Sequence, residues 1–257
     1  MSEEHTLIQS RENALLKRLR QLARDTTAYR KLGQVFLEGD HLCRALLERG
    51  GRPEVVVVKA SAHGRMDSEL LASAPRLAIV ADELWDGLSG LDSPAPIGFL
   101  LAVPQPPSLG LSEPSVVLDR LQDAGNVGSI LRSAAAFGFK QVLAIKGTAG
   151  LWSPKVVRAG MGAHFGLTLH EGLSADDVNQ LSIPLLATSS HRGQWLHESA
   201  LPWPCAWMLG HEGQGLQTAL EARAAQSVRI GQPGGEESLN VAAAAAICLH
   251  ASAVGRH

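Results

Sequence analysis

Strands and helices alternate along the second half of this 257-residue chain, and this alternation most limits the folds open to it. Apolar runs that predict buried strands are SVVLD (115–119), QVLAI (141–145), SIPLLAT (182–188), CAWML (205–209) and SVRI (227–230). Helices are expected between them: up to about Gly138, after Ser153, over residues 214–225, and in the alanine-rich segment after SVRI. The alternation predicts an α/β fold whose parallel sheet is covered by helices and binds ligands beyond the carboxyl ends of its strands.

The first part of the chain predicts a second, smaller α/β domain. It contains the apolar residues 35–37, a helix-like segment at 40–49, strands at 55–58 and 77–80, and a third apolar segment at 98–103. The stretch PQPPSLGLSEP follows, and its prolines cannot extend a central strand or helix. We therefore predict one domain over residues 1–103, a linker over 104–114 and a second domain over 115–257.

An alanine-rich helix is expected near the end of the chain, where residues 238–249 read SLNVAAAAAICL. Ser238 and Asn240 are both strong N-cap residues, and alanine has the highest intrinsic helix propensity. The side chains behind this cap are too small and apolar for a solvent-exposed helix. A second element is therefore expected to pack against it at close range.

The segment AGNVGSILR (124–132) predicts a helix with two distinct faces. If the helix begins near Asn126, its geometry places on the apolar face Val127, Ile130, Leu131 and Ala134. The opposite face then presents Asn126, Ser129 and Arg132. Taken alone, the segment is better explained by an ordinary N-cap asparagine and a surface arginine than by a functional face.

A glycine-containing turn is predicted at LGHEGQGL (209–216), between a strand and a helix. Gly210, Gly213 and Gly215 allow a tight turn with exposed backbone amides, and Glu212 lies in its middle. The pattern is not GxGxxG, and no glycine-rich turn follows Asp119. A Rossmann-type dinucleotide site is therefore disfavoured.

Together, NVGSILR, LGHEGQGL and GGEESLNVAAAAA resemble, in order and spacing, the three motifs of the SpoU/TrmH family of RNA ribose 2′-O-methyltransferases, members of the SPOUT group. SPKVVRAGMGAHF resembles the family segment after the second strand, and SRENALLKRLRQLARD and VFLEGDHLCRALLERG resemble its substrate-binding domain. The resemblance implies a small α/β RNA-binding domain before a SPOUT-type parallel sheet with a deep trefoil knot. It also implies S-adenosyl-L-methionine as cofactor, a homodimer, and RNA as substrate, rRNA rather than tRNA.

The resemblance also implies site residues, which we carry over position by position. The implied catalytic residues are Asn126, Arg132, Glu212, Ser238 and Asn240. The implied cofactor-binding residues are Thr188, Leu209, Gly210, Glu212, Gly213, Ile230, Gln232, Ser238, Leu239 and Asn240. This chain departs from the family pattern at His211, at Gly231-Gln232 and at Ala242, where Asn, Pro-Met and Ser are commoner. A guanidinium stays protonated in proteins, so Arg132 is expected to stabilise the developing alkoxide and an adjoining phosphate rather than remove a proton.

A basic segment over residues 11–31 predicts contact with RNA. Its cationic residues are Arg11, Lys17, Arg18, Arg20, Arg24, Arg30 and Lys31. Helical spacing gathers Leu15, Leu16, Leu19 and Leu22 into one apolar stripe and leaves the cations mostly off it. The cations form either a solvated helix face or an arm that contacts phosphates without reading sequence.

Composition excludes several other classes of protein. The formal net charge is −2, so no strongly basic coat surrounds the molecule. Cys43, Cys205 and Cys248 form no CxxC pair, which argues against a disulfide framework or a zinc ribbon and favours a reducing, cytoplasmic location. No apolar run approaches a membrane span and the first residues lack a secretory h-region, so no membrane association is expected.

Histidines and tryptophans receive structural interpretations. The histidines form no HExxH or CxxC…HxxxH pattern, so no metal is expected, and only His211 is a possible neighbour of the site. Trp195, Trp203 and Trp207 could stack on bases, but packing is favoured. Three functions remain: ribose 2′-O-methylation, a catalytically silent RNA-binding or assembly factor on the same fold, and a Rossmann-type nucleotide enzyme that lacks its fingerprint.

Overall fold

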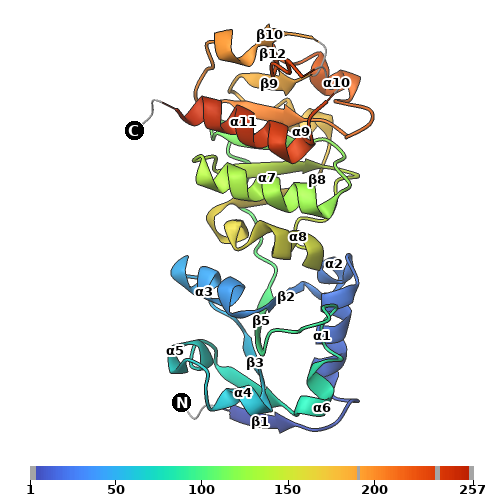
Figure 1. Cartoon of the computed structure of the whole chain (residues 1–257), viewed down its shortest axis with the longest axis vertical. Helices are drawn as coiled ribbons and strands as arrows, with labels where there is room; N and C mark the ends of the chain where they lie inside the picture. Colours follow the sequence, from blue (N-terminus) through green and yellow to red (C-terminus); the bar gives the residue numbers. More distant parts are fainter. Residues whose placement is uncertain (1–3, 190–191, 235–237, 255–257) are drawn as a thin grey trace. The chain divides into compact units, whose positions relative to one another are not determined.

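The computed structural model describes residues 4–189, 192–234 and 238–254, and its chain forms two compact units (Figure 1). The first unit comprises Met1–Gln105 and Trp152–Phe165, and the second Pro106–Leu151 and Gly166–His257. The two units therefore separate inside the predicted linker. Residues 152–165, which the sequence pattern assigned to the second domain, group with the first unit, because helix α8 (Pro154–Gly160) packs there on α1 (Ala14–Arg24) and β2 (Gln34–Glu38).

The first unit contains a mixed five-stranded sheet. Its strands in spatial order are β1 (Glu4–Ile8), β4 (Arg76–Val80), β3 (Val55–Lys59), β5 (Ile97–Ala102) and β2. β1, β4 and β3 run parallel, whereas β5 is antiparallel to both β3 and β2. Besides α1 and α8, its helices are α2 (Ala28–Leu32), α3 (Asp40–Glu48), α4 (Ala60–His63), α5 (Ser68–Leu71) and α6 (Asp82–Trp85). The predicted strands and the helix at 40–49 are confirmed, whereas β1, a sheet-edge strand with the short sequence EHTLI, was not predicted.

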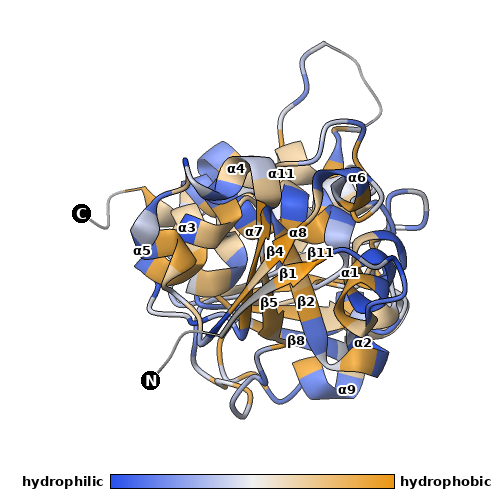
Figure 2. Cartoon of the chain, turned by 90° about the horizontal axis from the view of Figure 1, so that it is seen from below, coloured by the Kyte–Doolittle hydropathy of each residue, from blue (hydrophilic) through white to orange (hydrophobic). Residues whose placement is uncertain are grey.

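The basic segment forms two helices instead of one. α1 ends at Arg24 and α2 begins at Ala28, since Asp25 closes a turn by accepting hydrogen bonds of 2.8 Å from the backbone and the hydroxyl of Thr27. The predicted leucine stripe is buried as expected. The apolar and polar sides of α1 are visible as orange and blue in Figure 2, in which β4, β5 and β11 are mostly orange.

The second unit contains a seven-stranded sheet in which every neighbouring pair is parallel, as predicted. Its strands in spatial order are β10 (Gln194–Trp195), β12 (Gln226–Arg229), β9 (Leu185–Thr188), β11 (Ala206–Leu209), β6 (Ser115–Leu118), β7 (Gln141–Ile145) and β8 (Thr168–Leu173). The two unpredicted strands, β10 and β8, are the two edges of this sheet. Edge strands carry more polar residues, which hides them from a search for apolar runs.

Helices cover both faces of this sheet. α9 (Ala175–Val178) and α10 (Thr218–Glu221) place Val178 and Leu220 in a buried cluster with one set of alternating strand residues. α7 (Ala124–Ala136) and α11 (Val241–Ala253) pack side by side, and the Trp207 indole of β11 donates to the Ser252 hydroxyl of α11 at 2.8 Å. The helix expected over 214–225 is only α10, because the residues before it form the loop described below.

Within the described part of the chain, α11 buries one of its sides. Ala245, Cys248, Leu249 and Ser252 are buried, and the helix packs on α7 and β11. Close packing against a second element is thus found as predicted. On the other side Ile247 is 41% exposed, and Val254, which caps the helix, is 61% exposed. None of the helices formed by the described residues is long and apolar enough to cross a membrane.

Candidate active site

The predicted site residues come from loops at one edge of the parallel sheet and from the first turns of two helices. β9, β11 and β12 end at Thr188, Leu209 and Arg229, and β6 ends at Leu118. Because parallel strands end at the same edge, the segments that follow them gather there. The start of α7 and of α11 adjoin this edge, so residues distant in the sequence come together.

Three of the predicted catalytic residues form one hydrogen-bonded row. Asn240 Nδ2 donates to Asn126 Oδ1 at 2.9 Å, and Asn126 Nδ2 donates to Glu212 Oε1 at 3.4 Å. These bonds join residues 114 and 86 positions apart in the sequence. Each of the three motifs contributes one member of the row.

Two helix caps hold the amides of this row. Asp123 Oδ1 accepts the backbone N–H of Asn126 at 2.7 Å, so α7 starts at Ala124, two residues earlier than predicted. Asn240 is the N-cap of α11, and its Oδ1 accepts from the backbone of Ala242 and Ala243 at 2.9 and 3.2 Å. Because one atom of the Asn240 side chain caps the helix while the other contacts Asn126, a single residue fixes helix and site together.

Arg132 lies on the exposed face of α7, as predicted. Val127, Ile130, Leu131 and Ala134 are buried, whereas Ser129 and Arg132 are exposed and Asn126 is half-buried. Within the described part of the chain, the Arg132 guanidinium forms no hydrogen bond or ion pair. It is therefore available to a bound anion.

Residues 210–216, here called the glycine loop, are folded tightly on themselves. The backbones of His211 and Gly215 exchange two hydrogen bonds, of 3.0 and 2.8 Å. A Cβ atom at Gly210 would overlap the backbone of Gly215 and Leu216, and Gly215 has a left-handed φ of 68°. His211 Nδ1 accepts the backbone N–H of Gly213 at 3.1 Å, so this departure from the family pattern helps to shape the loop.

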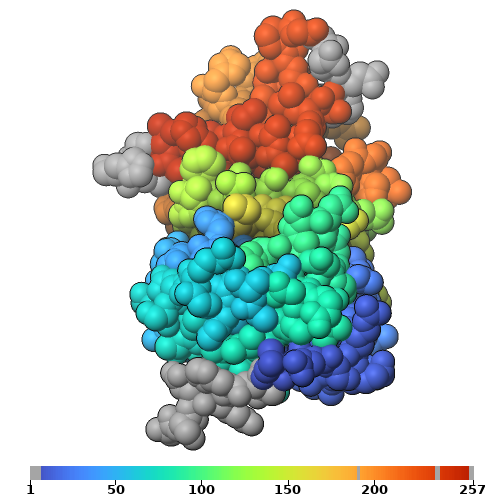
Figure 3. All heavy atoms as spheres, turned by 60° about the horizontal axis from the view of Figure 1, so that its bottom comes forward, coloured from blue at the N-terminus to red at the C-terminus, as the bar shows by residue number. Residues whose placement is uncertain are grey.

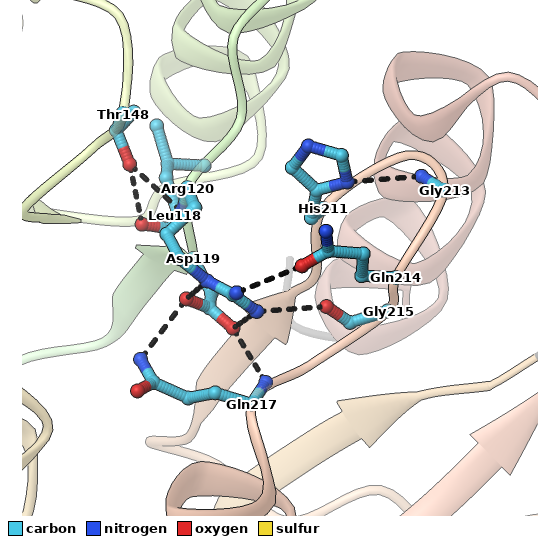
Figure 4. Close-up of polar contacts among 9 residues, drawn as sticks. All are labelled: Leu118, Asp119, Arg120, Thr148, His211, Gly213, Gln214, Gly215 and Gln217. Carbon is cyan, nitrogen blue, oxygen red and sulfur yellow. Dashed lines mark hydrogen bonds and ion pairs between the residues drawn. The ribbon is translucent and has the colours of Figure 1, made fainter.

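A buried carboxylate that was not predicted anchors this loop (Figure 4). Asp119 is fully buried and accepts hydrogen bonds from the backbone N–H of Gln217 at 2.7 Å and from its Nε2 at 3.0 Å. The Arg120 Nε donates to Asp119 at 2.8 Å, and this hydrogen bond holds the pKa of Arg120 above its ordinary value. An acidic residue at the end of a buried parallel strand was the available sequence signal for Asp119.

The predicted cofactor-binding residues surround the same sheet edge. Thr188 and Gly210 are half-buried, Leu209 is fully buried, and the Thr188 hydroxyl donates to the Met208 carbonyl at 3.1 Å. Ile230 and Gln232 are half-buried, and Glu212, Gly213, Ser238 and Leu239 are exposed. Residues 235–237 of the third motif lie outside the described residues.

The side chain of Gln232 offers a hydrogen-bond acceptor for a polar cofactor at this edge. Its Oε1 atom is buried and has no hydrogen-bond partner among the described residues. A buried amide oxygen without a partner is costly, so a ligand donor such as an exocyclic amine would satisfy it. The tightly folded glycine loop and this acceptor both fit a ligand that carries an adenosine group.

The basic residues of the first unit differ in their contacts. Arg24 Nη2 donates to the carbonyls of Gly87 and Ser89, and Arg20 Nη1 donates to the carbonyl of Arg11. Lys17 pairs with Glu12, and Arg18 donates to Gln34. Arg11, Lys17, Arg18, Arg24, Arg30 and Lys31 are exposed, whereas Arg20 is half-buried. Arg24 thus helps to hold a neighbouring loop. The segment that carries these cations is dark blue in Figure 3 and lies at the surface of the first unit.

The cysteines lie in the interior of the protein. All three cysteines are buried, and burial raises the pKa of the Cys248 thiol to about 12. Among the described residues, no group of three or more His, Cys, Asp or Glu side chains is placed to hold a metal ion. Trp207 is a fully buried core residue, as the packing interpretation predicted, and the Arg229 guanidinium lies 3.5 Å from the ring centre of half-buried Trp195.

Comparisons with known proteins agree with this arrangement. Residues 113–250 match the SpoU rRNA methylase family. A relative from Synechocystis, named as an uncharacterized tRNA/rRNA methyltransferase, is 30% identical over 95% of this chain and 92% of its own length. The 23S rRNA (guanosine(2553)-2′-O)-methyltransferase RlmP of Bacillus subtilis is 27% identical over 86% of this chain and 88% of its own length.

The fold agrees as well. The SpoU methyltransferase AviRb from Streptomyces viridochromogenes, solved with S-adenosylmethionine, superposes with a TM-score of 0.84 over 95% of this chain and 98% of its own, at 23% identity. The sheet, the glycine loop and the Asn240–Asn126–Glu212 row therefore belong to an S-adenosylmethionine-dependent RNA methyltransferase. The chain is a member of the SpoU methylase family, as its three motifs indicated.

Proposed function

We propose that this chain transfers a methyl group from S-adenosylmethionine to a ribose 2′-hydroxyl of ribosomal RNA. The observation that carries the proposal is the row of Asn126, Asn240 and Glu212, which unites three motifs at one edge of the sheet. The relative from Bacillus subtilis is named as a 2′-O-methyltransferase of 23S rRNA. Transfer RNA is the alternative substrate, since the Synechocystis relative is named for both RNAs.

Residues of this chain supply orientation and charge for the transfer. The cofactor provides an electrophilic methyl group on its sulfonium. The amides of Asn126 and Asn240 orient the ribose and the methionine end of the cofactor, and Glu212 holds Asn126 in place. Arg132 binds the adjoining phosphate and stabilises the negative charge that develops on the 2′-oxygen. Because the guanidinium is already protonated, the hydroxyl proton passes to water or to another group.

Cofactor binding is assigned to the loops after β9, β11 and β12. The backbone near Thr188, Leu209, Gly210, Gly213 and Ile230 would line the cofactor, with Ser238 and Leu239 near its methionine end. The buried and unpaired Oε1 of Gln232 would accept a hydrogen bond from the adenosine portion. Gly231-Gln232 would thus replace the stiffness of the commoner Pro-Met by a side-chain contact.

A homodimer with a knotted catalytic fold completes the proposal. The outward side of α11 and the residue preceding its cap leave Leu239, Ile247 and Val254 between 39% and 61% exposed. This apolar side of an alanine-rich helix suits a second copy of the chain. In the sheet, β9 separates β12 from β11. After β12 the chain crosses back, and α11 packs against α7 and β11, a path compatible with a trefoil knot. We place the protein in the cytoplasm, where its RNA substrate would be.

RNA binding is assigned to the first unit. The exposed cations of α1 and α2 would neutralise backbone phosphates, and the buried leucine stripe would keep α1 attached to its sheet. Among these residues Arg24 also has the structural role described above. The first unit thereby contributes affinity, whereas the second unit performs the chemistry.

Deletion of the gene followed by mapping of ribose methylation across all rRNA and tRNA tests the proposal. One 2′-O-methyl mark is expected to disappear, and wild-type protein but not Asn240→Ala should restore it. The location of the mark distinguishes rRNA from tRNA. If no mark disappears and the purified protein binds no S-adenosylmethionine, the catalytic proposal is wrong and a silent RNA-binding factor becomes the better description.

A further inference from the structure

Arg120 adopts a backbone conformation that arginine rarely accepts. Its φ is 59°, and Met161, with 49°, is the other non-glycine residue with a positive φ in the described part of the chain. Left-handed backbone is costly for a residue with a Cβ, and it persists only where surrounding contacts over-determine it. At this position glycine would adopt the backbone conformation without strain. Contacts of the Arg120 side chain therefore have to offset the strain that arginine introduces.

The Arg120 backbone is held on the side of β6. Its N–H donates to Thr148 Oγ1 at 3.0 Å, and the Thr148 hydroxyl donates to the Leu118 carbonyl at 2.9 Å (Figure 4). Gly147 leaves room for the side chain, since a Cβ there would come within 3.3 Å of Arg120 Cγ. These contacts fix the Arg120 backbone, and thereby the position from which its side chain extends.

The guanidinium reaches the glycine loop, more than 90 positions away in the sequence. Nη1 donates to Gln214 Oε1 at 3.1 Å and Nη2 to the Gly215 carbonyl at 3.4 Å. Nε and Nη2 also donate to the two oxygens of Asp119, at 2.8 and 3.2 Å. Arg120 therefore links the middle of the loop to the buried carboxylate that holds the loop's end through Gln217.

We propose that Arg120 is a positioning residue that holds the glycine loop in the shape that receives the methyl donor. The inference rests on the proposed function and adds to it a residue outside the three motifs' implied site. Within the described part of the chain, the Arg120 side chain donates to Asp119 and the glycine loop, not to Asn126, Arg132 or Asn240. Its removal should consequently affect cofactor affinity and leave the transfer step itself largely intact.

Arg120→Gly is the informative variant. It removes the side chain with its guanidinium contacts, and glycine accepts the left-handed backbone without strain. If the loop then adopts its receptive shape about one tenth of the time, the apparent Kd for S-adenosylmethionine rises about tenfold. The KM for the cofactor should rise in parallel, whereas kcat at saturating cofactor should stay near that of the wild type. Calorimetric titration of the full-length protein and steady-state kinetics with RNA measure these quantities.

Added guanidinium ion distinguishes a specific role of the Arg120 guanidinium from a general loss of stability, because only the former should be rescued by the ion. Low millimolar guanidinium chloride should restore part of the affinity of Arg120→Gly, and sodium chloride at the same concentration should not. Arg223→Gly removes the same side chain from an exposed position of the same unit and should leave the Kd unchanged. An unchanged Kd in folded Arg120→Gly, a loss confined to kcat, or weaker binding that guanidinium does not restore would each overturn the inference.

Gln214→Ala covers the case in which Arg120→Gly does not fold. It removes one acceptor from the loop side of the contact and leaves Asp119 paired, so a smaller rise in Kd is expected. No change in its Kd would count against the inference. If the wild-type protein binds no S-adenosylmethionine at all, the proposed function fails instead, and the two failures are thus distinguishable.

Discussion

The glycine loop and the paired ends of α7 and α11 form two sides of one site, but they are built differently. The loop is tied to a fully buried carboxylate with four donated hydrogen bonds. On the other side, exposed or half-buried amides meet each other, and Arg132 is exposed. The glycine loop, which we propose receives the cofactor, is thus fixed by buried contacts. The side proposed to hold the catalytic groups is more exposed to solvent.

Replacing Arg132 should have the largest effect. Arg132→Ala is expected to reduce kcat on the order of 10²–10³-fold, as removal of a group that stabilises an oxyanion typically does. The Tm should hardly change, since the side chain is exposed and forms no hydrogen bond or ion pair within the described part of the chain. Methyl transfer to RNA and thermal unfolding measure the two quantities. Near-full turnover of Arg132→Lys with an unchanged pH dependence would contradict a special role for the guanidinium.

Asn240→Ala should harm both the helix cap and the site, and the site more. Removal of the cap costs about 1 kcal/mol of unfolding free energy, whereas removal of the hydrogen bond to Asn126 is expected to lower turnover by about tenfold or more. Denaturant unfolding and single-turnover transfer report the two effects.

Asn13→Ala is the matched control for this prediction. Asn13 caps α1 in the same way, and its Oδ1 accepts from the backbone of Leu15 and Leu16 at 2.9 and 3.4 Å. A similar decrease in stability with unchanged turnover is expected. If both variants reduced turnover equally, the effect of Asn240→Ala would reflect stability alone.

The double variant Lys17→Gln/Arg18→Gln should weaken RNA binding without affecting cofactor affinity. The slope of log K against log salt is negative, and its magnitude falls by about 0.7–0.9 for each phosphate-neutralising cation that is removed. Binding is expected to weaken for all RNA sequences alike. Arg65→Gln makes the same kind of charge change on an exposed residue after α4 and should leave the slope unchanged. Equal slopes for the double variant and the wild type would leave the cations as a solvated face.

His211→Asn is expected to have the smallest effect. The asparagine oxygen can also accept the backbone N–H of Gly213, so the Kd for S-adenosylmethionine should change by less than about twofold. His211→Ala removes that acceptor and should weaken binding more. Titration of the two variants with S-adenosylmethionine measures what the acceptor at position 211 contributes to cofactor affinity. Equal Kd values for both would show that the His211–Gly213 hydrogen bond is unimportant.

Sequence patterns were most informative where structure is local. The faces of α7, the leucine stripe of α1 and the cap at Asn240 follow from helical spacing and from the chemistry of neighbouring residues. Edge strands such as β1 and β8 escaped prediction, because one side of each is unpaired and their sequences mix polar with apolar residues. The break between α1 and α2 escaped as well, since a single aspartate at position 25 closes that turn.

The sequence by itself determined the α/β class, the order of the three motifs and the residue types available for methyl transfer. Only the tertiary structure decided that Arg120 and Asp119 anchor the glycine loop, and that residues 152–165 belong with the first unit. The physical reason is distance along the chain. A guanidinium that contacts residues more than 90 positions away produces no periodic or spacing pattern in the sequence, because these contacts depend on how whole strands pair.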